Sequence, residues 1–285
     1  MIIKSPSQTS RIGFYRAKAR ELRLRVLKMI RQARKGHIGG SFSCADILVA
    51  VYYSGLFNLA PHGRTDHFIM SKGHCAAVLY AVLQDVGWFD AEQTGRYGGD
   101  DTLLGGHPDF RLPGVEVSSG SLGMGLGLGA GLALAAKLDG RAGRVLVLTG
   151  DGECAEGSIW EAAMFGARHR LDNLIWIVDR NRLGALDDTE TSAGLEPLAD
   201  KVTAFGWEVS EVDGHDFEQL IAALSLAGGS ASGRPRALIA ATVKGRGVSF
   251  MENEAAWHHG VPDDNEYQQA LIELGQTGSS EGGVD

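Results

Sequence analysis

The chain has 285 residues, including 40 glycines and 7 prolines, and a formal net charge of −8. Glycine is about twice as frequent as its usual ~7%, but scarce proline and a hydrophobic content of 44% exclude collagen and low-complexity disorder. The negative charge argues against a nucleic-acid-binding protein. Three separated cysteines, Cys44, Cys75 and Cys154, show no CxxC pattern, which argues against a disulfide framework or a zinc site. With no apolar signal segment in the first ten residues, we expect a cytoplasmic protein.

The first predicted element is a strongly basic helix over Arg11–Lys35, which holds ten Lys/Arg and one acid, Glu21, and stops at Gly36. Apolar residues recur in it at helical spacing, at Leu22, Val26, Met29 and Ile30. The basic residues indicate a solvated or subunit-facing surface, with phosphate steering as the alternative.

Two further apolar helices are predicted over Ala45–Leu56, with Ser43 as N-cap, and over Cys75–Val86. Residues Asp85–Pro113 are predicted to form loops with short helices. Val117–Ala136 has no charged residue over 20 positions, enough to raise the question of a membrane span. It contains six glycines and three serines and lacks aromatic residues at its ends, so we expect a loop that leads into a buried helix and no membrane contact.

The rest of the chain alternates between apolar runs and helical patterns. Continuous apolar runs predict strands at Arg144–Thr149, Leu174–Val178 and Arg236–Val243, with a further short strand at Glu208–Val212. Helices are predicted between them, at Ser158–His169, Leu198–Phe205 and Phe217–Ala227. Strands that do not alternate and are separated by helices indicate an α/β fold, a parallel sheet with helices on both faces. We expect one domain over residues 11–274, an N-terminal extension at 1–10 and a disordered tail at 275–285.

Functional groups follow three of the predicted strands, namely Asp151, Asn181 and Lys244. Ligands of open α/β sheets bind beyond the carboxyl ends of the strands. The sequence lacks a Walker A loop, a correctly spaced GxGxxG and a GxSxG elbow. A carboxylate between Gly150 and Gly152, with an amide oxygen thirty residues later, suits a hard divalent cation that also binds a diphosphate. A helix cap is the alternative explanation for Asp151.

Several histidines stand beside glycine, where the backbone can approach a ligand closely. They are His37 in GHIGG, His74 in SKGH, His107 in GGHPD, and the pair His258-His259 before Gly260. Histidines buried in a core do not need such neighbours. The pattern favours a ligand site over packing.

From Arg20 to Asp263 the ordered motifs resemble the thiamine diphosphate-binding half of transketolase. They are GHIGGSFSCADILVAVYY, SKGHCAAVLYAVL, GGHPD, SSGSLGMGLGLGAGLA, TGDGECAEGSIWEAA, VDRN, TVKGRGVSFMEN and WHHG. One departure is Arg180, where the family usually has asparagine before Asn181. The resemblance implies a thiamine diphosphate-binding fold.

The resemblance also implies roles for individual residues. Asp151, Asn181 and the Leu183 carbonyl would hold Mg²⁺ (or Ca²⁺ or Mn²⁺). Thiamine diphosphate would contact Gly120, Ser121, Leu122, Gly150, Gly152 and Glu153, and His37 and His74. His37, His74 and His107 would act on substrate oxygens. Glu156 and Glu161 would join a carboxylate network across a dimer interface. The late diphosphate-binding histidine is His258 by the Trp-His match and His259 by the His-Gly-x-Pro match, and both remain candidates.

In this family the glutamate that activates the cofactor lies in a second domain, for which no sequence follows Asp263. The resemblance therefore implies the N-terminal subunit of a split transketolase that moves a two-carbon ketol unit between small sugars. A separate C-terminal, pyrimidine-binding subunit would complete each site, with two copies of each. The alternatives are a subunit of a deoxyxylulose phosphate synthase-like or 2-oxo acid dehydrogenase-like enzyme, and a non-catalytic scaffold. The sequence leaves the sugars, their phosphorylation and the pathway open.

Overall fold

The protein is described by a computed structural model for residues 8–185, 187–226 and 232–275. Its centre is a five-stranded, fully parallel sheet in the order β1-β2-β3-β5-β4. The strands are β1 (His67–Met70), β2 (Val145–Gly150), β3 (Leu174–Arg180), β4 (Glu208–Asp213) and β5 (Arg236–Ala241). All four predicted strands are confirmed. The sequence pattern missed β1, a four-residue edge strand.

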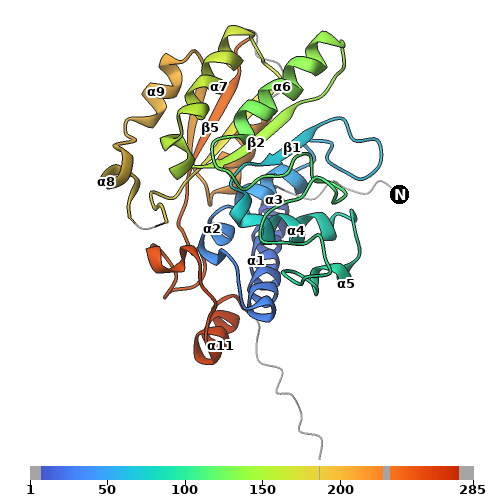
Figure 1. The fold of residues 1–285 in the computed structure, drawn as a ribbon, viewed down its shortest axis with the longest axis vertical. Helices are drawn as coiled ribbons and strands as arrows, with labels where there is room; N and C mark the ends of the chain where they lie inside the picture. Colours follow the sequence, from blue (N-terminus) through green and yellow to red (C-terminus); the bar gives the residue numbers. More distant parts are fainter. Residues whose placement is uncertain (1–7, 186, 227–231, 276–285) are drawn as a thin grey trace, which may run out of the picture.

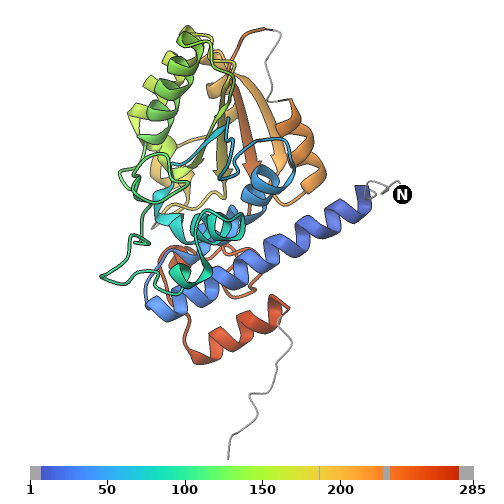
Figure 2. The same cartoon turned by 90° about the vertical axis from the view of Figure 1, so that its right-hand side faces the viewer.

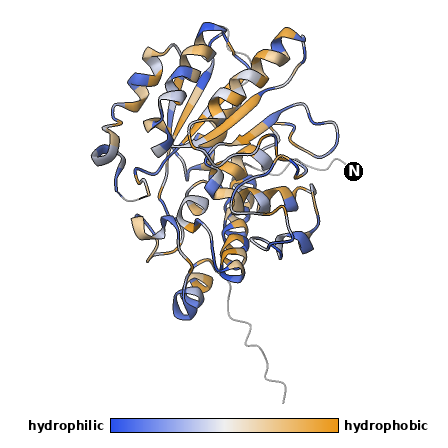
Figure 3. Ribbon diagram, viewed as in Figure 1, coloured by the Kyte–Doolittle hydropathy of each residue, from blue (hydrophilic) through white to orange (hydrophobic). Residues whose placement is uncertain are grey.

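Strands β1, β2, β3 and β5 are largely buried on both faces, which explains why they are continuous apolar runs, whereas the edge strand β4 is partly exposed. Along β2, Leu146 and Leu148 enter one hydrophobic cluster, whereas Val145 and Val147 enter the other. Figure 3 shows these strands as strongly hydrophobic segments between the helices. The α/β prediction with helices on both faces is confirmed.

Helices form a layer on each side of the sheet (Figures 1 and 2). One face of the sheet packs against α6 (Gly125–Leu138), α7 (Gly157–Arg168) and α9 (Leu198–Ala204). The other cluster contains side chains of α1 (Gln8–Ala33), α3 (Ala45–Tyr53), α4 (Ala76–Asp85) and α10 (Phe217–Ser225). Shorter elements lie in the connections: α2 (Ile38–Ser43), η1 (Gly73–Cys75), α5 (Ala91–Thr94), η2 (Gly152–Ala155), α8 (Thr189–Ala193) and η3 (Ala255–His258). The last described helix is α11 (Asp264–Glu273).

The basic helix α1 begins at Gln8, inside the predicted extension 1–10, and ends at Ala33. Its predicted apolar face is buried. Part of its positive charge is neutralised within the chain, because Arg23 pairs with buried Asp46, and Lys18 and Arg25 lie 3.0 and 2.7 Å from Asp85. The expectation of a solvated surface is therefore wrong for these three cations.

Two local predictions are corrected. Ser43 does not cap α3, because it is the last residue of α2, and its hydroxyl lies 2.5 Å from the Asp179 carboxylate. The helix after the glycine-rich loop, α6, is only half buried, since Met124 before it and Leu128 within it are 51% and 41% exposed. One side of α6 packs on the sheet and the other side does not.

Other predictions concern absences and chain ends. In the described ranges, no helix is long and apolar enough to cross a membrane. All three cysteines are free and buried, as expected. The predicted tail 275–285 lies outside the described residues except for Gly275, and the end of the predicted helix Phe217–Ala227 does so as well.

Candidate functional site

A cavity of about 470 Å³ opens at the carboxyl edge of the sheet. Ten of the residues predicted to form the site line it: His74, Gly120, Leu122, Gly150, Asp151, Gly152, Glu153, Asn181, Leu183 and His258. The register brings the ends of β2 and β3 together, because Gly150 pairs with Asp179 and so places Asp151 beside Arg180, one residue before Asn181. This is the strand-end position that the sequence predicted.

Asp151 begins the turn after β2 and is 2% exposed. Its Oδ1 accepts a hydrogen bond from the Gly152 N–H at 2.8 Å, and its Oδ2 accepts from the Arg182 N–H at 2.6 Å. The Arg180 guanidinium donates to Oδ2 at 3.0 Å. Burial raises the pKa of Asp151, and nearby Asp179 raises it further, whereas the N–H and Arg180 donors oppose the shift.

The other two predicted metal ligands are held on the loop after β3. The Asn181 Oδ1 accepts from the Leu183 N–H at 3.1 Å, and the Leu183 carbonyl accepts from Lys244 Nζ at 2.9 Å. Lys244 also contacts the Gly184 carbonyl at 2.6 Å and His258 Nδ1 at 3.2 Å. Burial, followed by the charge of Lys72, lowers the pKa of Lys244 to about 8.

The donor set fits a hard divalent cation. A carboxylate, an amide oxygen and a backbone carbonyl are the oxygen ligands that Mg²⁺ accepts, and all three residues line one cavity. Among the described residues, no group of three His, Cys, Asp or Glu side chains could hold a metal ion, so the amide and carbonyl oxygens are needed. A Cβ added at Gly150 or Gly152 would meet nothing within 4 Å, so these glycines border open space rather than packed protein.

Glu153 is a buried carboxylate in the wall of the cavity. It is 1% exposed, and its two oxygens accept hydrogen bonds from the Ser71 hydroxyl at 2.6 Å, the Gly123 N–H at 3.0 Å and the Gly150 N–H at 2.9 Å. Three segments of the chain are therefore joined through one carboxylate. Glu153 lines the cavity as predicted, but the structure gives its oxygens to protein donors.

The five predicted histidines form one cluster around His37, and two of them, His74 and His258, line the cavity. The ring of His37 lies 5.2 Å from that of His74, 6.2 Å from His107, 5.4 Å from His258 and 4.7 Å from His259. Burial, and then the neighbouring charge of His74, lowers the pKa of His37 to about 4. Burial, and then Lys244, lowers the pKa of His258 to about 3. Both rings are neutral at pH 7 and can donate or accept a proton in hydrogen bonds.

The two late histidines differ in place. His258 lines the cavity beside Lys244, whereas His259 is exposed and is not among the cavity residues. Likewise Ser121 is exposed outside the cavity wall, between Gly120 and Leu122. Gly120 faces the ring of His107, since a Cβ there would lie 3.4 Å from it.

Glu156 and Glu161 lie apart from the cavity on the exposed surface, before and within α7. On the same helix, Met164 is 56% exposed and Phe165 is 39% exposed. The surface that carries the predicted carboxylate pair is thus partly apolar.

A buried lysine was missed as part of the site, although its motif SKGH was noted. Lys72 is 1% exposed, forms an ion pair with Asp179 and donates to the Gly40 carbonyl at 3.1 Å. Lys72 and Gly40 both line the cavity. The available signal was a lysine two residues before the histidine of the motif SKGH.

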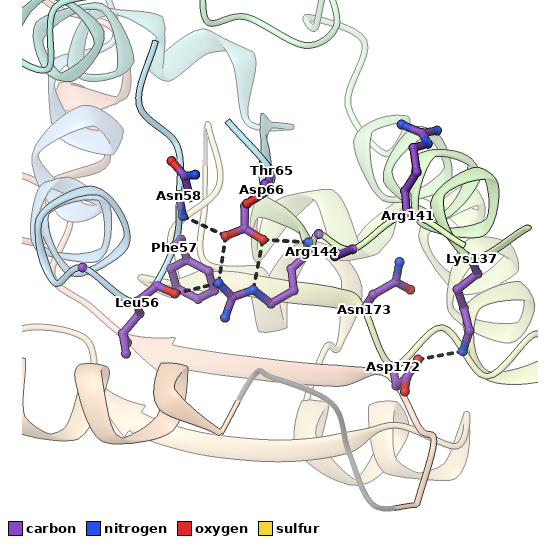
Figure 4. Close-up of a pocket in the computed structure, with 13 residues that line it drawn as sticks. Leu56, Phe57, Asn58, Thr65, Asp66, Lys137, Arg141, Arg144, Asp172 and Asn173 are labelled. Carbon is purple, nitrogen blue, oxygen red and sulfur yellow. Dashed lines mark hydrogen bonds and ion pairs between the residues drawn. The ribbon is translucent and has the colours of Figure 1, made fainter. Parts of the chain in front are cut away.

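A second cavity of about 680 Å³ lies at the opposite, amino edge of β1, β2 and β3 (Figure 4). Its cations are paired: Arg144 contacts Asp66 at 2.8 Å and lies over the Phe57 ring, and Lys137 contacts Asp172 at 2.6 Å. The predicted site residues are not part of its wall. The predicted site residues therefore line the cavity at the carboxyl edge and not this one.

A family model described as transketolase, thiamine diphosphate binding domain, matches residues 15–281. The chain belongs to the transketolase family. It is 43% identical over 258 residues to an apulose-4-phosphate transketolase subunit of Phocaeicola vulgatus, covering 89% of this chain and 91% of that one. It is 36% identical to the 6-deoxy-6-sulfo-D-fructose transketolase subunit SqwG of a Clostridium species, covering 92% and 96%.

Other relatives are longer than this chain. Rat transketolase is 36% identical, and the match covers 90% of this chain but 41% of the rat protein. The structure of Campylobacter jejuni transketolase superimposes with a TM-score of 0.85 at 28% identity, covering 92% of this chain and 43% of that one. The resemblance to the N-terminal subunit of a split transketolase, a transferase, is confirmed, as is the thiamine diphosphate-binding fold.

Proposed function

We propose that this chain is the N-terminal subunit of a two-subunit transketolase that moves a two-carbon ketol unit from a ketose to an aldose. The observation that carries the proposal is the cavity in which Asp151, Asn181 and Leu183 lie together with His74 and His258. The length of the chain, matched to relatives named as transketolase subunits, supports the division of the enzyme into two chains.

The cavity residues hold the cofactor in this proposal. Asp151, Asn181 and the Leu183 carbonyl bind Mg²⁺, or Ca²⁺ or Mn²⁺ in its place, and the backbone at Gly150 and Gly152 lies against the diphosphate. The Lys244 ammonium, which lines the cavity, adds positive potential for that anion. When bound, thiamine diphosphate supplies the nucleophilic carbon for carbon–carbon bond transfer.

Substrate oxygens are oriented by the histidine cluster. His74 lines the cavity, and the ring of His37 lies 5.2 Å from that of His74 and 6.2 Å from that of His107. The lowered pKa values of His37 and His107 keep these rings neutral at pH 7. A neutral imidazole can donate one N–H to a developing oxyanion and accept a hydroxyl proton with its other nitrogen. The cluster thus positions the sugar and shuttles protons without adding a fixed charge.

The partner in the proposal is a separate C-terminal subunit, with two copies of each chain in the assembly. Glu156 and Glu161 are exposed beside the apolar Met164 and Phe165, as expected for carboxylates that meet another subunit. The chain also spans only about two fifths of the single-chain transketolases.

The substrate class is a ketose donor with an aldose acceptor. The names of the Phocaeicola and Clostridium relatives contain a phosphorylated sugar and a sulfo sugar, respectively, so the sugars named for these family members differ. A panel of phosphorylated and unphosphorylated ketoses therefore belongs in the assay.

The test is a ketol-transfer assay with thiamine diphosphate and Mg²⁺, on the full chain alone and after mixing with its C-terminal subunit. We expect activity only when the two subunits are mixed. Full activity of the single chain would contradict the two-subunit proposal. An active mixture in which Asp151→Asn and His74→Asn change nothing would contradict this cavity as the site.

A further inference from the structure

Arg180 ends β3 at the position where the sequence departs from the family pattern. It is 4% exposed, and its guanidinium donates hydrogen bonds to three side chains and forms an ion pair with a fourth, Glu190, at 3.5 Å. Nη1 donates to Asp151 Oδ2 at 3.0 Å and to the Thr189 hydroxyl at 2.7 Å. Nε and Nη2 donate to Glu196 Oε1 at 3.1 and 2.6 Å. A planar guanidinium can satisfy several acceptors at fixed angles, which a lysine cannot do.

The acceptors belong to different parts of the site. Asp151 is the predicted metal ligand after β2, whereas Thr189 and Glu196 belong to residues 188–196, which we name the α8 wall. Four residues of this wall line the cavity: Thr189, Ser192, Ala193 and Leu195. Arg180 therefore joins the metal-binding carboxylate to the wall of the cofactor cavity.

The other hydrogen bonds of the α8 wall are mostly local. The Asp188 carboxylate accepts from the Glu190 and Thr191 N–H groups, and the Glu190 carboxylate accepts from the Leu195 and Glu196 N–H groups. Such bonds shape the segment but do not attach it to the sheet. The contacts with the rest of the molecule include the buried Leu195 side chain, the Thr189 N–H to the Arg182 carbonyl, and the Leu183–Asp188 bridge. Lys201 of α9 donates to the Gly194 and Leu195 carbonyls at 2.9 and 2.8 Å. Arg180 provides the side-chain contacts from β3.

Asp151 does not depend on Arg180 for its orientation, because the Gly152 and Arg182 N–H groups hold both of its oxygens. The guanidinium does place a positive charge on the oxygen that a divalent cation would share. Like charges this close repel. The arginine thus disfavours the cation while it holds the wall.

We propose that Arg180 is a positioning residue that holds the α8 wall in place before the cofactor binds. Arg180 thereby raises the affinity of the site for thiamine diphosphate and lowers its affinity for the divalent cation. The first part concerns the ligand-free chain. The second part rests on the proposed function.

The first experiment measures hydrogen exchange in the full chain without ligands. In Arg180→Gln we expect amides of residues 188–196 to exchange about tenfold faster, the effect of losing one hydrogen bond to a charged group, while α7 keeps its protection. Arg168→Gln, an exposed arginine at the end of α7, is the matched control. Unchanged protection of the α8 wall would overturn the proposal. If Arg180→Gln does not fold, Glu196→Gln weakens the same connection from the exposed side.

The second experiment measures ligand binding by the chain in complex with its C-terminal subunit. Mn²⁺ binding is followed by electron paramagnetic resonance, and thiamine diphosphate binding is followed at saturating Mn²⁺. In Arg180→Gln we expect Mn²⁺ to bind at least as tightly as in the parent protein and thiamine diphosphate about tenfold more weakly, with partial rescue of Arg180→Ala by methylguanidine.

An equal loss of both ligands, without rescue, would mean a general structural defect and would overturn the positioning role. If the parent complex binds neither ligand while hydrogen exchange still depends on Arg180, the proposed function fails and the attachment of the wall stands.

Discussion

Replacing Glu153 with glutamine should destabilise the protein, because the Glu153 carboxylate joins three chain segments beneath the cavity. Its oxygens accept from the Ser71 hydroxyl and from the Gly123 and Gly150 N–H groups. Glutamine has one acceptor oxygen where glutamate has two. Its NH₂ group therefore replaces one acceptor, and at least one of the three donors loses its hydrogen bond to residue 153. The site is closed to water, since Glu153 is 1% exposed.

The magnitude follows from the lost acceptor. A buried donor without a partner costs about 1–3 kcal/mol, and the remaining bonds become neutral rather than charge-assisted, for a total of about 2–4 kcal/mol. In a protein of this size that corresponds to a fall in Tm of about 5–15 °C. Urea denaturation and calorimetry of Glu153→Gln measure both quantities. Glu211→Gln, exposed on β4, is the control and should stay within about 0.5 kcal/mol of the parent.

The same experiment decides the charge of Glu153. Burial raises the pKa of this carboxyl, whereas the Ser71, Gly123 and Gly150 donors favour the charged form. If the native group were protonated, glutamine would imitate it closely. A stability change no larger than that of the Glu211 control would therefore refute the ionised, three-donor arrangement.

Three further predictions concern the metal site, the glycine-rich helix and the histidines. Asp151→Asn should weaken Mg²⁺-dependent thiamine diphosphate binding at least about tenfold in equilibrium dialysis while the chain stays folded; unchanged binding would remove Asp151 from the metal site. Gly129→Ala should cost about 1–3 kcal/mol in denaturant titrations, because its Cβ would lie 2.4 Å from a β2 methyl group. Gly131→Ala, which faces open space, should stabilise α6 by about 0.5–1 kcal/mol, and equal effects of the two would contradict the packing. The pKa values of His37 and His258 are lowered to about 4 and about 3 in the folded protein, from about 6.5 in the unfolded chain. The free energy of unfolding should therefore be highest above pH about 6.5 and should decrease as the pH falls towards the folded values. The double variant with asparagine at both positions should show a weaker dependence of urea midpoint on pH, and an identical dependence would contradict the buried neutral rings.

The sequence by itself determined four of the five strands and the edge of the sheet at which the predicted site residues meet. Buried parallel strands are continuous apolar runs, and such runs preceded Asp151, Asn181 and Lys244. Since parallel strands end at one edge, their following residues meet there. The short strand β1 escaped because four residues, His67–Met70, are too few to form a pattern.

The tertiary structure decided which side chains act on one another. Arg180 is a small departure in a motif when read in the sequence, but in the fold it donates hydrogen bonds to both Asp151 and Glu196. Lys72 is an ordinary lysine in the sequence, but in the fold it is buried against Asp179, 107 positions away. Periodicity reports the backbone and the buried face of each element, because these depend on neighbours in the chain. Ion pairs depend on the packing of distant elements, which no local pattern contains.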